Sequence, residues 1–444
     1  MNNNANNNKK KVVLWGASGF SNMGDEAMLA GDLAKARELM GNRLDIVVLS
    51  FHPEVTAKMH KVRSEHDLPW LISKKTDGCA KLIKARILLS IAVRLVWNAR
   101  RIKKGKSVKL LDHEERGFIL TLAGADGFFI VGGGNINDIF VRGGLIARSF
   151  TCYLLKIMGK PIFVGAQTIG PLDRWCTRFL AKIFLRMCNE VTLRENFSKE
   201  LLAEIGVQCE KIAVVADDAF NIIPVSREAA VGILANEGVD LENIKRKNQK
   251  IVAVIPRAWW KWKKESAPLR DALEDITNFL LNQKNIYTIF VSTSFFQGLG
   301  DDDAETAREI IGKTKFAKND NYKVLSGRYD WNQLKGLLSV VNAVVGSSYH
   351  SIIFSASADV PVLGLYADEY YRLKIGGFFN LIGLEQLAID VRNLPGKELH
   401  GIFEKFLDNE IEIKKSLARK NEEIRKRSCR AMSQMAKYLF KEKK

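Results

Sequence analysis

The sequence predicts an α/β protein built from two doubly wound domains. Short apolar runs alternate with longer helical patterns, which is typical of a mainly parallel sheet with helices on both faces. This alternation occurs twice, and the polar, Lys- and Asn-rich segment 226–249 separates the two series. The length of 444 residues also suits two domains of about 200 residues each.

The first series is expected to form an N-terminal domain of residues 11–225. Its short apolar runs, rich in β-branched residues, predict strands at Lys11–Gly16, Leu44–Phe51, Gly127–Val131, Pro161–Gly165, Glu190–Arg194 and Lys211–Ala216. Apolar residues at helical spacing predict helices at Glu26–Met40, 80–111, Arg148–Met158, Trp175–Cys188 and Ser198–Ile205.

The second series is expected to form a C-terminal domain of residues 226–400. Its predicted strands are Ile251–Ile255, Ile286–Ser292, Tyr322–Leu325, Ala343–Gly346 and Val362–Leu365. Its predicted helices are Leu269–Gln283, Asp303–Gly312, Trp331–Val340 and His350–Ser357. A basic helical region, 401–444, follows. Two such Rossmann-like domains are expected to face a cleft, and ligands of open sheets bind beyond the carboxyl ends of the strands.

The first ten residues are polar and Asn-rich, so segment 1–10 is expected to be a disordered tail rather than a secretory signal. Six cysteines occur without a C-x-x-C pair or a neighbouring histidine at zinc-ligand spacing. Reduced thiols in a cytoplasmic protein, with no metal site and no cofactor, are the expectation.

The net charge of +18 comes from 68 Lys and Arg against 50 Asp and Glu, and it is concentrated in two segments. Segment 74–109 holds twelve Lys and Arg and one Asp, and segment 408–444 holds twelve against six acids, which leaves the rest nearly neutral. A nucleic-acid enzyme more often spreads its cations around a binding cleft, so we expect no nucleic-acid partner.

The basic segment 74–109 contains an amphipathic helix within 80–106. Its apolar run Ile87–Trp97 is shorter than the roughly 20 residues that span a bilayer. Ile87, Leu88, Ile91, Ala92, Leu95 and Val96 share one face, and Arg86, Arg94, Arg101 and Lys104 share the other. Two alternatives stay open. The helix lies on an anionic membrane, placing the protein at the inner membrane face, or its apolar face packs on the protein and its basic face is solvated.

Three loops of the N-terminal domain follow strands and carry glycine beside polar side chains. Loop 16–26 contains Gly24, Asp25 and Glu26, and a carboxylate there either caps the following helix or contacts a sugar hydroxyl. Loop 132–138 contains Gly133, Asn135 and Asp138, and loop 165–171 contains Gln167. For these the alternatives are a ligand site or a tight turn with an Asx cap.

Further strand ends carry cationic or titratable side chains. Arg194 follows a strand and offers a bidentate fork for an anion, unless it pairs with an acid of Asp217-Asp218. His350 opens a helix directly after a strand, a position that suits a neutral imidazole or a donor to an incoming anion. The acidic run 301–303 is expected to be a helix cap rather than a metal site.

The ordered loops resemble the polysaccharide pyruvyl transferase family over roughly residues 11–390. The matching stretches are GASGFSNMGDEAML, VGGGNINDIF, GAQTIGPL, TLRENFSKELLAEIG, VADDAF, VIPR and GSSYHSIIFSASADVPVLGLYADEYYRLKIGGF. The resemblance implies a fold similar to the GT-B glycosyltransferases, a phosphoenolpyruvate (PEP) donor, and a saccharide or lipid-linked acceptor that receives a ketal-linked pyruvate.

The same resemblance implies roles for individual residues. The catalytic candidates are His350 and Asp25. The PEP-binding candidates are Arg194, Lys374, Ser347 and Arg257. The acceptor-binding candidates are Gly24, Gly133, Asn135, Asp138 and Gln167. Family members often carry arginine two residues before this histidine, whereas this chain has Ser348. Arg257, Arg372 or another residue is expected to replace that cation, or else the donor or the activity has changed.

Two other classes of function remain open from the sequence. A GT-B-like glycosyltransferase with a nucleotide-sugar donor would share the architecture, and Asp368-Glu369 would then bind ribose. A basic-surface binding protein without catalysis is the third possibility.

Overall fold

The computed structural model describes residues 9–441 except 208–211, 259–260, 262–263 and 297–300. Most of the expected N-terminal tail therefore lies outside the described residues. The chain divides into two compact units. The N-terminal unit comprises 9–20, 28–218 and 429–441, and the C-terminal unit comprises 21–27 and 219–428.

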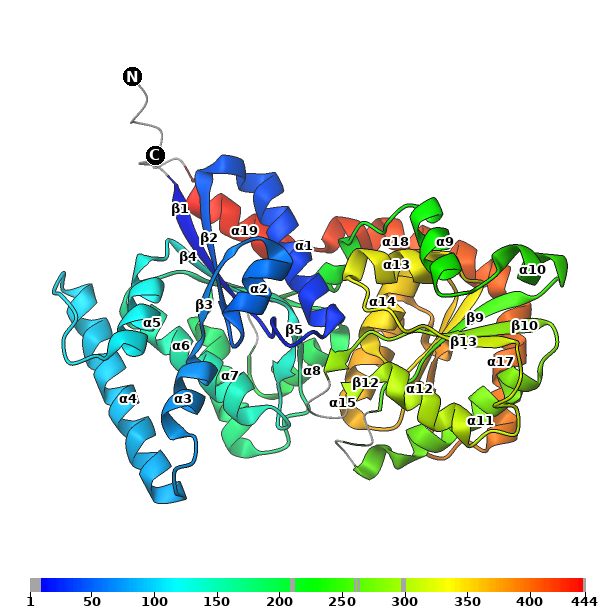
Figure 1. Ribbon diagram of the computed structural model, residues 1–444. Helices are drawn as coiled ribbons and strands as arrows, with labels where there is room; N and C mark the ends of the chain where they lie inside the picture. Colours follow the sequence, from blue (N-terminus) through cyan, green and yellow to red (C-terminus); the bar gives the residue numbers. More distant parts are fainter. Residues whose placement is uncertain (1–8, 208–211, 259–260, 262–263, 297–300, 442–444) are drawn as a thin grey trace. The chain divides into compact units, whose positions relative to one another are not determined.

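The N-terminal unit is built on a parallel sheet (Figure 1). Its strands lie in the order β3 (Arg63–His66), β2 (Leu44–Ser50), β1 (Lys10–Trp15), β4 (Gly127–Ile130), β6 (Ile162–Ile169), β7 (Glu190–Leu193) and β8 (Ile212–Val214), with β5 (Gly133–Ile136) paired to β6. Its helices are α1 (Met23–Met40), α2 (Pro53–His60), α3 (Leu68–Thr76), α4 (Lys81–Lys103), α5 (His113–Gly124), α6 (Ala147–Ile157), α7 (Trp175–Met187), α8 (Asn196–Glu204) and α19 (Arg430–Leu439). The central strands are fully buried because helices cover both faces, which explains their continuous apolar runs.

The C-terminal unit repeats this plan on a second parallel sheet. Its strands lie in the order β13 (Tyr322–Val324), β10 (Ile286–Phe290), β9 (Lys250–Ile255), β14 (Ala343–Gly346), β15 (Val362–Tyr366) and β16 (Ala388–Asp390). Its helices are α9 (Arg227–Asn236), α10 (Leu241–Arg246), α11 (Ala267–Asn282), α12 (Asp303–Gly312), α13 (Trp331–Ser339), α14 (Tyr349–Ser357), α15 (Glu369–Tyr371), α16 (Gly377–Ile382), α17 (Gly396–Asp408) and α18 (Glu410–Arg427). Two parallel sheets with helices confirm the predicted α/β class.

Each unit also contains one short segment that is far from the rest of that unit in the sequence. These segments are 21–27 in the C-terminal unit and 429–441 in the N-terminal unit. Segment 21–27, which includes the first turn of α1, belongs to the C-terminal unit because it bonds the loop after β10. Met23 N donates to Thr293 O at 3.1 Å, and Asn22 forms an antiparallel bridge with Ser294. Helix α19 belongs to the N-terminal unit, where Met435 is buried against Gly127. The basic region expected at 401–444 is thus divided between the units.

Over the described ranges, every helix is too short or too polar to cross a membrane.

Candidate functional site

Four loops of the C-terminal unit leave the same edge of its sheet. Strands β10, β9, β14 and β15 are parallel neighbours, so the residues that follow them gather at the carboxyl edge. These residues are Thr293 and Ser294 after β10, Arg257 after β9, Ser347 to His350 after β14, and Asp368 to Lys374 after β15. The sequence predicted Arg257, Ser347, His350 and Lys374 as site residues, and the structure brings them to this one edge.

The junction between β14 and α14 places His350 in the first turn of the helix. Ser347 ties this junction to the end of β9, because its Oγ accepts from Arg257 N at 2.9 Å and its own N–H donates to Ile255 O. His350 is buried, with 7% of its surface exposed. The backbone N–H groups of a helix N-terminus attract an anion, so the imidazole sits where an anionic ligand is favoured.

His350 lies against the first turn of α1. A Cβ atom added to Gly24 would come within 1.8 Å of His350 Nδ1, so only glycine leaves room for the ring. Asn22 holds this turn in place, since its Oδ1 accepts from Gly24 N at 3.1 Å. Gly24 was predicted as an acceptor-binding residue. In the structure, it is also the residue against which the His350 ring packs. Asp25, the next residue of the turn, is half-buried.

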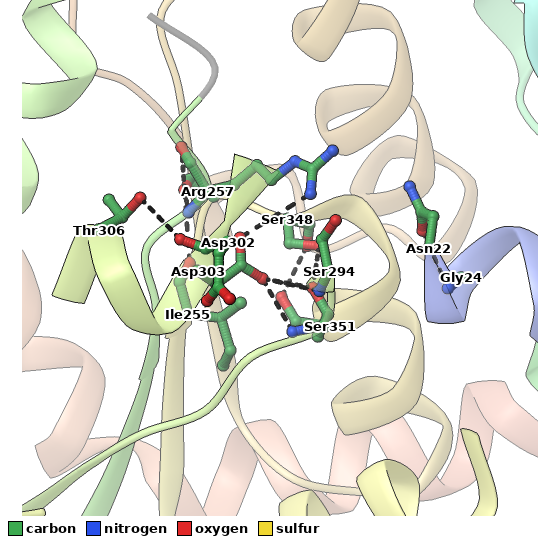
Figure 2. Close-up of polar contacts among 12 residues, drawn as sticks. Asn22, Gly24, Ile255, Arg257, Ser294, Asp302, Asp303, Thr306, Ser348 and Ser351 are labelled. Carbon is green, nitrogen blue, oxygen red and sulfur yellow. Dashed lines mark hydrogen bonds and ion pairs between the residues drawn. The ribbon is translucent and has the colours of Figure 1, made fainter. Parts of the chain in front are cut away.

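A buried carboxylate orients the side chain of Arg257. Asp303 Oδ1 lies 3.8 Å from Arg257 Nη1, and Asp303 Oδ2 accepts from Thr293 N and Ser294 N at 2.8 and 3.2 Å. Figure 2 shows the two charged groups joined by this ion pair, with Ser294 and Ser348 beside them. Sequence reasoning missed Asp303, because the acidic run 301–303 reads as a cap, and Asp302 does cap α12.

Ser348 occupies the position where the resemblance leads us to expect arginine. Its Oγ lies 3.1 Å from Thr293 Oγ1, which in turn donates to Asp303 Oδ2. Ser348 is thereby connected to the carboxylate that orients Arg257. Arg372, the other expected substitute, pairs with Glu369 at 2.6 Å on the surface. Of these two arginines, Arg257 is therefore the one connected to Ser348 through Asp303 and Thr293.

Lys374 lies in an aromatic cage beside His350. Its Nζ is 3.3 Å from the hydroxyl of Tyr370, and 5.2 and 4.7 Å from the ring centroids of Tyr349 and Tyr370. The Tyr349 ring is also 5.1 Å from that of His350, so one tyrosine contacts both the predicted catalytic histidine and the predicted PEP-binding lysine. Aromatic faces stabilise a buried ammonium without neutralising it. The edge thus combines two cations, an imidazole and a helix N-terminus.

The N-terminal unit holds the other predicted acceptor residues. Gln167 is buried and its Nε2 donates to Val131 O at 2.7 Å, while its Oε1 has no partner among the described residues. Asp138 Oδ2 accepts from Asp173 N at 2.7 Å and from Arg174 N at 3.1 Å, so it ties its loop to the segment after β6. The Asx-type turn offered as the alternative is formed by Asn137, whose Oδ1 accepts from Ile139 N and Phe140 N. Gly133 pairs with Gln167 in the sheet, and Asn135 is half-buried.

Arg194 is 1% exposed and belongs to the N-terminal unit. Its Nη1 donates to Asp217 Oδ2 at 2.6 Å and its Nε to Thr168 Oγ1 at 2.7 Å. The salt bridge that the sequence offered as an alternative is therefore present. Burial, together with the Asp217 charge, raises the pKa of neighbouring Asp218 to about 7, and burial raises the pKa of Asp32 well above its usual range.

A pocket of about 580 Å³ lies at the β3 edge of the N-terminal sheet. It is lined by Glu54, Glu65, His66, Asp67, His113 and Glu114, among others, and by none of the predicted site residues. Burial raises the pKa of Asp67 to about 6. Because four of the lining residues carry carboxyl groups and none is Lys or Arg, the pocket disfavours a small anionic ligand.

In the described parts of the chain, no group of three or more His, Cys, Asp or Glu side chains is placed to hold a metal ion.

A model of the polysaccharide pyruvyl transferase family matches residues 22–369, so the chain belongs to that family. The amylovoran biosynthesis protein AmsJ of Erwinia amylovora is similar over 94% of this chain and 96% of its own length, at 23% identity. The expectation of a transferase in polysaccharide biosynthesis is thereby confirmed.

Solved structures resemble the chain at low sequence identity. A glycosyltransferase from Rickettsia africae ESF-5 matches with a TM-score of 0.59 and 14% identity, over 98% of this chain and 99% of that one. Anabaena Alr3699/HepE in complex with UDP and glucose matches with a TM-score of 0.57 and 14% identity, over 97% and 99%. These likenesses concern the fold alone, and they confirm the GT-B-like class.

Proposed function

We propose that the chain transfers the pyruvyl group of PEP to two hydroxyls of a saccharide, forming a ketal, during polysaccharide biosynthesis. The observation that carries the proposal is the position of His350, which lies at one sheet edge with Arg257 and Lys374. PEP bears a carboxylate and a phosphate, so two cations and a helix N-terminus match its charge.

The proposed reaction begins with proton transfer to C3 of PEP, which makes C2 electrophilic. A first sugar hydroxyl attacks C2 and loses its proton, and the C2–O bond to phosphate then breaks. A second hydroxyl attacks the same carbon and loses its proton, which closes the ketal and leaves inorganic phosphate. His350 is proposed as the general acid or base, with Asp25 orienting or activating the acceptor hydroxyl.

Donor contacts are assigned to Arg257, Lys374 and the β14–α14 junction. Ser347 is proposed to shape that junction, because its hydroxyl already binds backbone groups of the β9 end. Arg194 is proposed to support the N-terminal unit, since its guanidinium is committed to Asp217 and Thr168. The saccharide acceptor is proposed to bind Asn135, Gln167 and the turn that contains Gly133 and Asp138.

The nucleotide-sugar alternative gains no support from its candidate carboxylates. Asp368 accepts from Ser266 Oγ at 2.6 Å and from Tyr371 N at 2.8 Å, so it caps α15. Glu369 pairs with Arg372. Neither contact pattern resembles a carboxylate held ready for ribose hydroxyls.

PEP-dependent phosphate release, measured over a panel of free and lipid-linked saccharides, tests the proposal. We expect release only when a suitable acceptor is present, and a higher melting temperature with PEP than with UDP-sugars. Phosphate release that fails with every acceptor, combined with stabilisation by a UDP-sugar alone, would favour the glycosyltransferase alternative.

A further inference from the structure

The α4 helix carries two apolar faces, and only one of them packs on the protein. Ile91, Leu95 and Ala99 are buried, and Ile87 and Val96 pack against the same core. This is the apolar face identified in the sequence. Arg94 is held beside it by an ion pair with Glu115 of α5. Most of the predicted apolar face is therefore occupied by the protein itself, while Leu88 of that face is 39% exposed.

The second apolar face points to solvent. Leu82, Leu89, Val93 and Trp97 are 70%, 67%, 60% and 40% exposed. Steps of seven, four and four residues place them along one side of the helix. The first half of α4, residues 81–90, contains no buried residue, and Figure 1 shows α4 at the margin of its unit beside α3 and α5. Large apolar groups in such a row are uncommon on a soluble surface.

Basic side chains surround this exposed row. The helix contains seven Lys and Arg and no acid, and Lys104 and Lys106 follow it directly. Arg86, Arg100 and Lys104 are exposed, and the guanidinium of Arg101 lies 4.8 Å from the Trp97 ring centroid. Apolar residues flanked by cations, with a tryptophan among them, are typical of helices that lie in a lipid headgroup layer.

We propose that the exposed face of α4 binds an anionic membrane surface, with Leu82, Leu89, Val93 and Trp97 entering the headgroup layer. The helix of 23 residues is about 34 Å long and lies along the surface rather than across it. The positive charge of this face favours an anionic surface as its partner, because a neutral or basic partner would leave the Lys and Arg side chains of α4 unpaired. The proposal does not depend on the donor of the reaction.

Point variants test this surface better than a deletion, because removing α4 would also remove Ile91 and Leu95 from the core. The first variant is Leu89→Gln with Val93→Gln, and its matched control is Ile223→Gln with Ile411→Gln, two aliphatic side chains that are 76% and 67% exposed in the C-terminal unit. The second variant replaces Arg86, Arg100 and Lys104 with Gln. Its control replaces the exposed Lys414, Lys415 and Arg419 of α18.

Sedimentation with vesicles of phosphatidylcholine alone, or of equal parts phosphatidylcholine and phosphatidylglycerol, provides the measurement. We expect the full chain to bind only the anionic vesicles, and more weakly at high salt. Each lost cation should lower binding by roughly fivefold, so the charge variant should lose about a hundredfold. The apolar variant should lose at least about tenfold. Both controls should bind as the wild type does.

Wild-type binding by both α4 variants would overturn the proposal. So would a wild-type dimer that the apolar α4 variant converts to a monomer in light scattering, since the exposed face would then cover a second copy of the chain. Phosphate release with a free saccharide acceptor should stay unchanged in both variants. That readout separates a failure of the membrane proposal from a failure of the proposed reaction.

Discussion

At the scale of single residues, the site depends on a contact between two positions that are far apart in the sequence. Gly24 and His350 lie in the first turns of α1 and α14, and the imidazole occupies the space where any other residue at position 24 would place its Cβ. The ring of His350, the proposed acid or base, can thus take this position because Gly24 has no side chain.

Gly24→Ala tests this arrangement. The new Cβ would fall 1.8 Å from His350 Nδ1, so the ring must move, and displacement of a catalytic group by about 1 Å costs about a hundredfold in rate. We expect phosphate release to fall by about that factor in a protein that still folds. Gly232→Ala on α9 is the control, because a Cβ there meets open space. A wild-type rate in Gly24→Ala would show that the ring position is unimportant.

Arg194→Gln distinguishes a supporting role from a donor contact. Removing one partner of a buried ion pair leaves Asp217 without its cation, so the free energy of unfolding should fall by about 3–5 kcal/mol. We expect the KM for PEP to stay near the wild-type value. The exposed Arg186→Gln should change stability by less than about 0.5 kcal/mol. A raised KM for PEP without a loss of stability would instead show that Arg194 contacts the donor.

At the scale of elements, the buried interior strands were predictable, whereas of the edge strands of the two parallel sheets β8 and β13 were predicted and β3 and β16 were not. β4 and β14 are buried runs of apolar residues, and the sequence located both. β3 reads RSEH and lies at the sheet edge with no fully buried residue, so it lacks the apolar run that marks a strand. β16 was missed for the same reason. The pocket beside β3 could therefore not be predicted from the sequence either.

Helix α13 carries a buried lysine with a measurable pH signature. Burial lowers the pKa of Lys335 to about 7, while its Nζ donates to Phe220 O at 2.9 Å. Between pH 7 and the usual lysine pKa, the unfolded chain holds a proton that the folded chain lacks. Stability from this group therefore rises with pH in that window, by up to about 1.4 kcal/mol per pH unit.

Urea unfolding of wild type and Lys335→Met at several values from pH 6 to pH 9 checks this sign. The wild type should gain stability relative to the variant as the pH rises above about 7. Lys415→Met, on the exposed side of α18, should run parallel to the wild type. Parallel curves for Lys335→Met as well would show that Lys335 is charged in the folded protein.

At the scale of the whole molecule, the order of the loops predicted the fold class and the family, and the sequence offered Asp217 as a partner of Arg194. The three-dimensional partners of the site residues in the C-terminal unit were not predictable. Arg257, Asp303 and His350 come from different loops, and their contacts exist only after the sheet has formed. The donor-side candidates other than Arg194 lie in the C-terminal unit, whereas most acceptor candidates lie in the N-terminal unit. The sequence also located the basic helix but selected the apolar face that the core occupies.

The most direct test of the account is transfer of carbon-labelled pyruvate from PEP to a saccharide, followed by detection of the ketal carbon by NMR. The wild type should form a labelled ketal and release phosphate, and His350→Asn with an unchanged melting temperature should lose most of this activity, by about a hundredfold or more. A folded His350→Asn variant that forms the ketal at the wild-type rate would contradict the assignment of His350. A wild type that forms no ketal with any acceptor while transferring sugar from a nucleotide would contradict the proposed function itself.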